Sequence, residues 1–262
     1  MTIGSVPASE AHRPSRWPGL PARLSPRLAV AALGFAVASV PVAVLGYAAT
    51  HGWAPLRSLD QGTAQRLNDW AVGQPGVVGF LQGVSTVLHP WAVRGVTAVV
   101  VGWLLVRRQT RLALWVATAI IGAGVLDFVL KDVVRRTRPI LPDAVASAPG
   151  YSFPSGHALT SIVAFGVAVL LVLPLVHGRW RVLVWVVAVA GVLLVGFARV
   201  ALGVHFVSDV VAGWLLGLGW LAVTAGAFES WRRAEGRRPH APSEVVTEGI
   251  DPAGSKVAAH TD

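Results

Sequence analysis

The chain has 262 residues, of which 54% are hydrophobic, only 13% are charged and none is cysteine. Because soluble globular domains carry about 25% charged residues, this composition excludes an ordinary water-soluble domain, and the lack of cysteine excludes disulfides and thiolate metal sites. The formal net charge of +9 would suit nucleic-acid binding, but the basic residues are distributed as in a membrane protein.

Five uncharged segments approach or reach the length of about 17–25 residues that a membrane-spanning helix needs. They are Leu28–Thr50, Leu112–Leu126, Ala158–Val176, Val182–Ala198 and Val210–Phe228. A sixth uncharged stretch, Trp70–Val93, is interrupted by prolines and a histidine. There we expect an interfacial helix near Gly76–Leu88 and a second span from about Trp91 to Val106. The sequence therefore predicts an all-α fold, a polytopic membrane bundle of about six transmembrane helices.

Most basic residues fall on one side of these six spans. In chain order they are Arg13, Arg16, Arg23 and Arg27; Arg107, Arg108 and Arg111; Arg179 and Arg181; and Arg232, Arg233, Arg237 and Arg238. An excess of Lys and Arg marks the cytoplasmic side, so we expect a multi-pass cell-membrane protein with both termini in the cytoplasm and no nucleic-acid partner. Residues 1–27 and 231–262 are predicted to be disordered tails that flank one domain at 28–230.

A second set of charged residues breaks this rule, because it falls in connections on the opposite, outer side. It comprises Lys131, Arg135, Arg136 and Arg138 after the third span, His157 at the start of the fourth, and Arg199, His205 and Asp209 between the fifth and sixth. Ionisable residues at membrane depth cost about 2.5–3.5 kcal/mol each on insertion scales and are usually functional. We therefore predict one site at which three outer connections converge, although Arg135 alone would equally suit a snorkelling anchor.

The residue spacing supports this convergence. Lys131 and Arg138 lie seven residues apart, so they would share one face of a continuing helix. His205 lies four residues before Asp209, a spacing that brings an imidazole and a carboxylate within hydrogen-bond reach on one helix.

Ser155 and Gly156 open the fourth span with free backbone amides and the positive end of the helix dipole, an arrangement that favours an anion. Several cations, free amides and two histidines with a single carboxylate suit a phosphate group. A tightly held divalent metal would need more oxygen or nitrogen ligands. We therefore expect a phosphate site without a bound metal or another cofactor.

Three short motifs follow one another along the chain. They are Lys131-(six residues)-Arg138-Pro139, Pro154-Ser155-Gly156-His157 and Arg199-(five residues)-His205-(three residues)-Asp209. In order, spacing and membrane placement they resemble the signature of the type 2 phosphatidic acid phosphatases, whose superfamily includes soluble bacterial acid phosphatases and vanadium haloperoxidases. The resemblance covers about residues 28–230. The third motif usually begins Ser-Arg, and Ala198 in place of that serine removes one donor for a phosphate.

The resemblance implies a reaction through a phosphohistidine. His205 would be the nucleophile, Asp209 would orient it, and His157 would protonate the leaving group and then deprotonate water. The phosphate oxygens would be held by Lys131, Arg138, Ser155, Gly156 and Arg199. Asp127, one helical turn before Lys131, is expected to pair with that lysine.

The function implied is that of an integral membrane lipid phosphatase with its site on the outer face, whose partners are the bilayer and a lipid substrate. It would hydrolyse a phosphomonoester or diphosphate of the phosphatidate or undecaprenyl diphosphate type. We favour the polyprenyl diphosphate, because that carrier must be dephosphorylated on the outer face. A lipid phosphotransferase with the same site stays open. A non-catalytic binding or transport protein would not need the full catalytic set, and a vanadium haloperoxidase is expected to be soluble.

Overall fold

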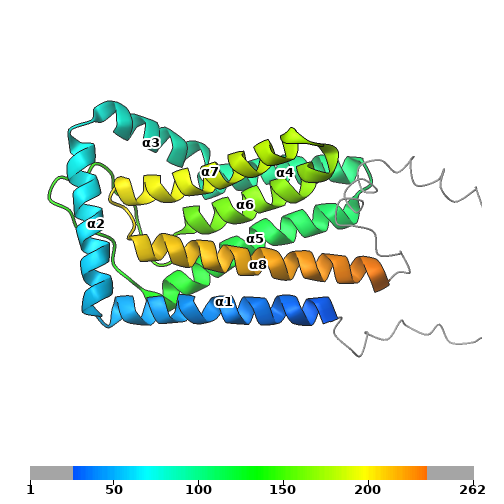
Figure 1. Ribbon diagram of the computed structural model, residues 1–262, viewed down its shortest axis with the longest axis horizontal. Helices are drawn as coiled ribbons and strands as arrows, with labels where there is room; N and C mark the ends of the chain where they lie inside the picture. Colours follow the sequence, from blue (N-terminus) through cyan, green and yellow to red (C-terminus); the bar gives the residue numbers. More distant parts are fainter. Residues whose placement is uncertain (1–25, 235–262) are drawn as a thin grey trace, which may run out of the picture.

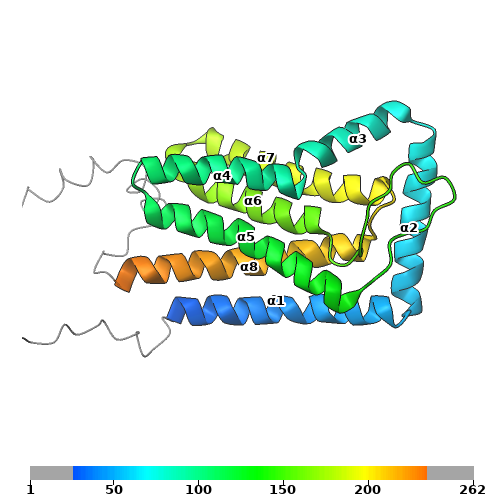
Figure 2. The ribbon, with the colours of Figure 1, turned by 180° about the vertical axis from the view of Figure 1, so that it is seen from behind.

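The computed structural model describes residues 26–234, which form eight α-helices and one 3-10 turn and contain no strand. The helices are α1 (Pro26–Thr50), α2 (Ala54–Val72), α3 (Pro75–Val87), α4 (Pro90–Val106), α5 (Thr110–Val134), α6 (Gly156–Val172), α7 (Arg179–Ala201) and α8 (Val207–Ala234), with the turn η1 at Leu173–Leu175. All except α2 and α3 run lengthwise in one bundle (Figures 1 and 2).

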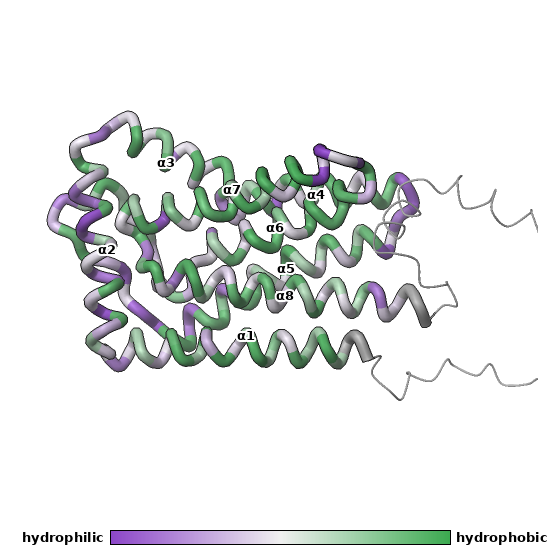
Figure 3. The backbone as a smooth tube through the Cα atoms, in the orientation of Figure 1, coloured by the Kyte–Doolittle hydropathy of each residue, from purple (hydrophilic) through white to green (hydrophobic). Residues whose placement is uncertain are grey.

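Five of these helices, α1, α5, α6, α7 and α8, are long and apolar enough to span a membrane. The pair α3–α4, bent by 41° at its break, counts as a sixth span if the two helices cross together. Figure 3 shows apolar residues along the bundle and hydrophilic residues concentrated at its two ends. The predicted all-α bundle of about six spans is confirmed, and the helix expected before the second span is α3.

Helix α2 is an element that hydropathy does not predict. It lies across one end of the bundle (Figure 1) and packs against α7, α8 and α3. Its buried residues recur every three or four positions, as expected for one face of a helix: Leu56, Asp60, Ala64, Asn68 and Ala71. Two of these five are polar, so the buried face of α2 brings hydrogen-bonding groups to that end of the bundle.

The two ends of the described chain lie together at the end of the bundle opposite α2, beside the α4–α5 and α6–α7 connections (Figure 1). The α5–α6 and α7–α8 connections lie at the α2 end. All three predicted motifs therefore lie at one end of the bundle, and the ends of the described chain lie at the other. The predicted tails fall almost entirely outside the described residues, although α8 continues to Ala234, beyond the predicted domain limit at 230.

The centre of the bundle is formed by α5, α6 and α8. Nε1 of Trp220 in α8 donates to the carbonyl of Ala119 in α5 at 2.8 Å. The indole ring covers Gly122, where a Cβ would lie 2.1 Å from a ring carbon, so only glycine admits this packing. These contacts fix α8 against α5, the two helices that carry Asp209 and Lys131.

Candidate active site

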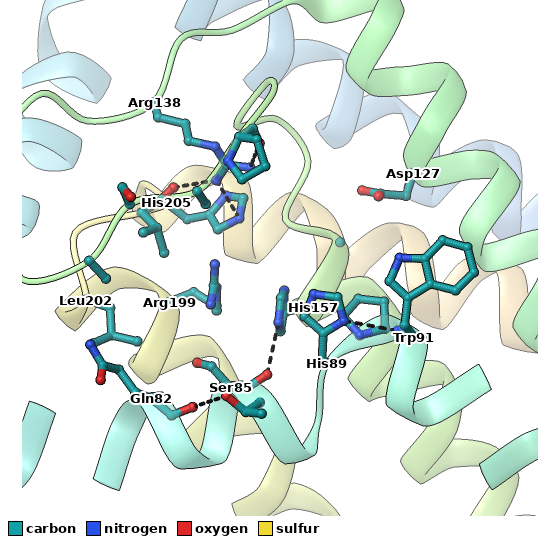
Figure 4. A pocket seen from close by; sticks show the side chains of 18 of the residues that line it. Gln82, Ser85, His89, Trp91, Asp127, Arg138, His157, Arg199, Leu202 and His205 are labelled. Carbon is teal, nitrogen blue, oxygen red and sulfur yellow. Dashed lines mark hydrogen bonds between the residues drawn. The ribbon is translucent and has the colours of Figure 1, made fainter. Parts of the chain in front are cut away.

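The three predicted motifs meet at a cavity of about 690 Å³ at the α2 end of the bundle, a size within the range of about 300–1,000 Å³ typical of small-molecule sites. Figure 4 shows the side chains that line it. The predicted site residues in its lining are Lys131, Arg138, Gly156, His157, Arg199 and His205. Ser155 and Asp209 are fully buried behind this lining. The structure therefore brings all eight predicted residues together.

Arg138 determines which nitrogen of His205 carries the lone pair. Its Nη1 atom lies 3.1 Å from Nε2 of His205, and because a guanidinium only donates, Nε2 accepts. The proton of the neutral ring is then on Nδ1, which faces Oδ2 of Asp209 at 3.5 Å. Arg138 is itself fixed by three backbone carbonyls, those of Val204, Gly150 and Pro149. His205 is thus held in the tautomer that a nucleophile at Nε2 requires.

His205 does not lie on a helix with Asp209, contrary to the expectation from their spacing. It lies in the short connection before α8, which begins at Val207. Oδ2 of Asp209 accepts from the backbone amide of Phe206 at 2.9 Å, so Asp209 shapes this connection as well as facing the imidazole. The distance of 3.5 Å to Nδ1 is long for a hydrogen bond, as is common before substrate binds.

Asp209 is held in turn by a buried ion-pair network. Its Oδ1 lies 2.6 Å from Nη1 of Arg136, and the other nitrogen of that guanidinium lies 2.7 Å from Oδ2 of Asp60 in α2. Ser208 joins the network: its backbone amide donates to Asp60 at 3.0 Å, and its hydroxyl accepts from Arg136 at 2.7 Å. Buried charges need such pairing to be tolerated. Helix α2 therefore supports the nucleophile through three side chains in series.

Lys131 and Arg138 reach the cavity from different elements. Helix α5 ends at Val134, and Arg135 adopts a left-handed conformation with φ of 51°. The continuing helix expected from the sequence therefore stops before Arg138, which approaches from the loop. Arg135 is exposed and pairs with Asp132 at 3.1 Å, as a surface residue would.

The expected pair between Asp127 and Lys131 is present. Nζ of Lys131 also donates to the carbonyl of Pro154 at 2.7 Å. The Asp127 carboxylate packs against Gly156, where a Cβ would lie 2.6 Å from Oδ2. Since an ammonium has three donors, Lys131 keeps one for the cavity while the other two fix its position. Gly156 is required here because Asp127 fills the space of a side chain.

Helix α6 begins at the cavity with Gly156 and His157 in its first turn. The Ser155 amide, expected to be free, donates to the backbone carbonyl of Asp209 at 2.9 Å, and the Ser155 hydroxyl accepts from Ala158 as an N-cap. The amides of Gly156 and His157 have no hydrogen-bond partner in residues 26–234 and lie at the positive end of the helix dipole. They are therefore the donors that suit an anion here, and Ser155 positions them.

His157 is oriented by the last turn of α3 and by the connection to α4. Its Nε2 lies 3.2 Å from the carbonyl of Ser85, which accepts from it, and the ring of His89 lies edge-on at a centroid distance of 5.0 Å. Arg199 lies beside His157 and on the same side of the cavity as His205 in Figure 4. Its side chain is nearly buried, and its Nε has no hydrogen-bond partner in the described part of the chain.

Burial lowers the pKa of His205 from 6.5 to about 4; Asp209 raises it, and Arg199 and Arg138 lower it further. The imidazole is therefore neutral at neutral pH, as the tautomer argument requires. Burial also lowers the pKa of the Arg138 guanidinium, which nevertheless stays charged because its ordinary pKa is so high.

The departure from the third motif has a small structural effect. Ala198 is fully buried in a cluster with Leu81 and Leu202 and does not line the cavity. In residues 26–234, no group of three His, Cys, Asp or Glu side chains could hold a metal ion. The permanently charged side chains in the lining of the cavity are four cations and the carboxylate of Asp127.

Motif reading did not assign roles to Asp60, Ser85, His89, Arg94 or Ser208. For Asp60 a local signal exists, since it shares a helix face with Leu56 and Ala64 and yet carries a charge. Arg94 carries a comparable signal, because it is a charge inside an otherwise apolar segment. Ser85, His89 and Ser208 have no such signal, because their roles depend on contacts with distant segments.

Comparison with known proteins places these observations in a family. The profile of the PAP2 superfamily matches residues 112–233. A solved structure titled as the first transmembrane PAP2 type phosphatidylglycerolphosphate phosphatase, from Bacillus subtilis, superimposes with a TM-score of 0.64 at 24% identity and covers 77% of this chain and 98% of that one. This likeness concerns the fold.

Three relatives are similar in sequence. An undecaprenyl-diphosphatase of Sulfolobus acidocaldarius is 33% identical over 58% of this chain and 73% of its own length. Phosphatidylglycerophosphatase B of Bacillus subtilis is 38% identical over 41% of this chain and 54% of its own. Lipid A 1-phosphatase of Rhizobium etli is 33% identical over 40% of this chain and 45% of its own. All three names describe phosphatases, in agreement with the predicted activity.

Proposed function

Because this chain belongs to the PAP2 superfamily, we propose that it is a membrane lipid phosphatase that acts through a phosphohistidine on His205. The membership confirms the resemblance carried by the three motifs. The observation that carries the proposal is the state of His205: Arg138 donates to Nε2 at 3.1 Å, Nδ1 faces Asp209, and the pKa of the ring is about 4. A neutral imidazole with a lone pair on Nε2 is ready to attack phosphorus.

The transferred phosphoryl group binds among the cations at this end of the cavity. Arg199 and Lys131 each offer a donor that no described carboxylate takes, and the amides of Gly156 and His157 add two more. When phosphate enters, Nη1 of Arg138 stops donating to Nε2 of His205 and donates to a phosphate oxygen instead. The lone pair on Nε2 is then free to attack. Fixed donors of this kind stabilise the charge that redistributes over the phosphoryl oxygens in the transition state.

In the first half-reaction, Nε2 of His205 forms a bond to phosphorus as the bond to the leaving oxygen breaks. Asp209 stabilises the positive imidazole by accepting from Nδ1. His157 gives its proton to the leaving oxygen. Because Nε2 of His157 is bound to the Ser85 carbonyl, Nδ1 is the nitrogen left to serve the leaving group. In the second half-reaction, His157 takes a proton from water, which attacks phosphorus and releases inorganic phosphate and neutral His205.

The substrate is a lipid phosphate that reaches the site from the bilayer, because the cavity lies at the end of membrane-spanning helices. Among the lipids named by the relatives, we propose a polyprenyl diphosphate of the undecaprenyl type, in line with the name of the Sulfolobus relative. A phosphatidate or phosphatidylglycerophosphate type of substrate is the competing choice.

The test is the capture of the covalent intermediate. Purified protein is mixed with substrate labelled with ³²P on the terminal phosphate and quenched in alkali, in which phosphohistidine survives. The wild type should retain label, and His205→Ala should retain none and release no phosphate. His157→Ala should slow turnover by about 10²–10⁴, and less with a good leaving group such as nitrophenol. Labelling of His205→Ala at the wild-type level would refute the assignment.

The phosphotransferase alternative shares every residue of the first half-reaction and differs only in the acceptor. Release of free phosphate is therefore measured with and without a second lipid alcohol. Phosphate release at the rate of substrate loss supports a hydrolase, whereas transfer of the label to the lipid alcohol supports a phosphotransferase.

A further inference from the structure

The cavity extends well beyond the residues that hold the transferred phosphate. In Figure 4, His205, Arg138 and Arg199 occupy one part, His157 follows, and His89 and Trp91 lie beyond His157. Arg94, from the first turns of α4, also lines this part of the cavity. His89, Trp91 and Arg94 have no role in binding the transferred phosphoryl group or in activating the nucleophile.

We propose that Arg94 and His89 form a second anion subsite, which binds the phosphate that stays on the leaving group, so that the preferred substrate is a lipid diphosphate. This inference rests on the proposed phosphatase function and specifies its substrate class.

Arg94 is a cation without a carboxylate partner in the described part of the chain. Its guanidinium carbon lies 4.6 Å from the centroid of the Trp91 ring. Its Nη2 crosses to α5 at Gly124, where a Cβ would lie only 2.5 Å away. The nearby carboxylate of Asp127 is already paired with Lys131. A charge placed in a membrane-spanning segment is usually functional. The position of Arg94 is fixed by its contact with the Trp91 ring and by its close approach to Gly124, where no side chain is in the way.

His89 adds a neutral donor to the same part of the cavity. It caps α4, and its Nδ1 accepts from the backbone amide of Trp91 at 3.2 Å. The proton of the neutral ring is therefore on Nε2. The ring lies edge-on to His157 at 5.0 Å, so the donor of His89 and the acid that serves the leaving oxygen are neighbours.

The charge around the cavity fits a diphosphate better than a monophosphate. Its lining contains four permanent cations, Lys131, Arg138, Arg199 and Arg94, and one carboxylate, Asp127. A phosphate monoester carries about −1.5 to −2 at neutral pH, and a diphosphate monoester carries more. Without Arg94, the net positive charge of the other three cations and Asp127 is already enough to balance the negative charge of a monoester. The fourth cation therefore balances the additional phosphate of a diphosphate.

The order of the residues fits the direction of the reaction. Phosphoryl transfer places the attacking and leaving atoms roughly in line, so groups on the far side of His157 from His205 face the leaving group. When the substrate is a monoester, the leaving group is a neutral alcohol, which gains nothing from Arg94. When the substrate is a diphosphate, the leaving group is a lipid monophosphate. The P–N bond to His205 forms as the bond from the terminal phosphorus to the bridging oxygen breaks. The bridging oxygen keeps the electron pair and takes the proton of His157.

The lipid chain has a path from this subsite. Leu88 and Val93, the chain neighbours of His89 and Arg94, line an apolar groove of about 330 Å³ that runs between α4 and α6. The chain of the leaving lipid phosphate would lie in this groove, with its phosphate on Arg94.

The experiment compares farnesyl diphosphate with farnesyl monophosphate, two substrates with the same chain, in one detergent. Arg94→Gln should lower kcat/KM for the diphosphate at least tenfold, mainly through KM, and change the value for the monophosphate less than twofold. Arg94→Lys should recover part of the loss. The matched control is Arg107→Gln, since Arg107 lies at the other end of α4 and also stacks on a tryptophan, at 5.8 Å from Trp103; it should change neither value.

A second readout measures binding directly. By titration calorimetry, Arg94→Gln should weaken binding of inorganic diphosphate at least fivefold and leave binding of orthophosphate unchanged. Equal loss of activity on both substrates, or unchanged affinity for diphosphate, would overturn the subsite and leave the phosphatase proposal standing. A wild type that hydrolyses neither substrate would refute the proposed function, and the calorimetric comparison would then still decide whether Arg94 binds the second phosphate.

Discussion

The carboxylate of Asp60 lies 2.7 Å from the guanidinium of Arg136, although 76 residues separate them in the chain. Arg136 also binds Asp209 at 2.6 Å, and Asp209 faces His205. A helix that lies across the end of the bundle thus contributes the last member of the network behind the nucleophile. Asp60 is a positioning residue in this arrangement, because it acts only through Arg136 and Ser208.

Replacing Asp60 with asparagine should leave Arg136 with one carboxylate partner and loosen Asp209. Since removing one member of a buried pair destabilises by about 3–5 kcal/mol, we expect a lower melting temperature in detergent and at least a tenfold lower kcat with a smaller change in KM. Asp69→Asn is the control, because Asp69 is exposed on the same helix and, within residues 26–234, bonds only Gln65. Wild-type kcat in Asp60→Asn would show that the network does not position Asp209.

The pH dependence of His205 follows from its surroundings. Because its pKa is about 4, the reactive neutral form should persist until the pH falls to about 4, and the rate of phosphoenzyme formation should decline below that value. Arg138 lowers the pKa of His205, so Arg138→Gln should raise that pKa. The acid limb of its residual activity should then lie at a higher pH than in the wild type.

Arg135→Gln is the matched control, since Arg135 is exposed and paired with Asp132; its acid limb should coincide with that of the wild type. An acid limb in Arg138→Gln at the wild-type position or below it would contradict the assigned contact between Arg138 and His205.

Asp127 should contribute through Lys131 and not through the phosphate itself. In Asp127→Asn the ammonium loses its ionic partner and keeps only the Pro154 carbonyl, so we expect about a tenfold loss in kcat/KM and weaker inhibition by vanadate. Asp132→Asn, a change to an exposed acid on the same helix, should have no effect. Full activity of Asp127→Asn would show that Lys131 does not need this partner.

Chelation should leave turnover unchanged, because the proposed phosphate contacts come from side chains such as Arg138 and Arg199 and from amides of α6. Vanadate should inhibit by occupying the same contacts. Complete loss of phosphate release in EDTA, restored by magnesium, would show that the reaction class is different.

Sidedness is tested by reporter fusions. Arg108 lies in the α4–α5 connection and Arg179 begins α7, both at the end of the bundle shared by the ends of the described chain, and the loop that contains Ser147 lies at the α2 end (Figure 2). By the positive-inside rule, fusions at Arg108 and Arg179 should report the cytoplasm and a fusion at Ser147 the exterior. A cytoplasmic signal at Ser147 would reverse the proposed orientation and place the site on the inner face.

The sequence by itself determined the spans and the three motifs, because both are local. A hydrophobic run reports its burial in lipid wherever it lies in the chain, and each motif keeps its residues within a few positions. The sequence predicted Lys131, Arg138, His157, Arg199 and His205 as one site because the order of the spans places their three connections on the same side. The prediction from residue spacing that Arg138 and His205 lie on helices was wrong, because both residues lie in loops.

Only the tertiary structure decided how that site is supported and how far it extends. Asp60 meets Arg136, Ser85 meets His157, and Arg94 reaches Gly124 through contacts between segments far apart in the chain. No periodicity encodes these contacts, since they depend on how α2 lies across the bundle and how α3 bends away from α4. A polar residue in a helix indicates that it needs a partner; the packing of the helices determines which partner it finds.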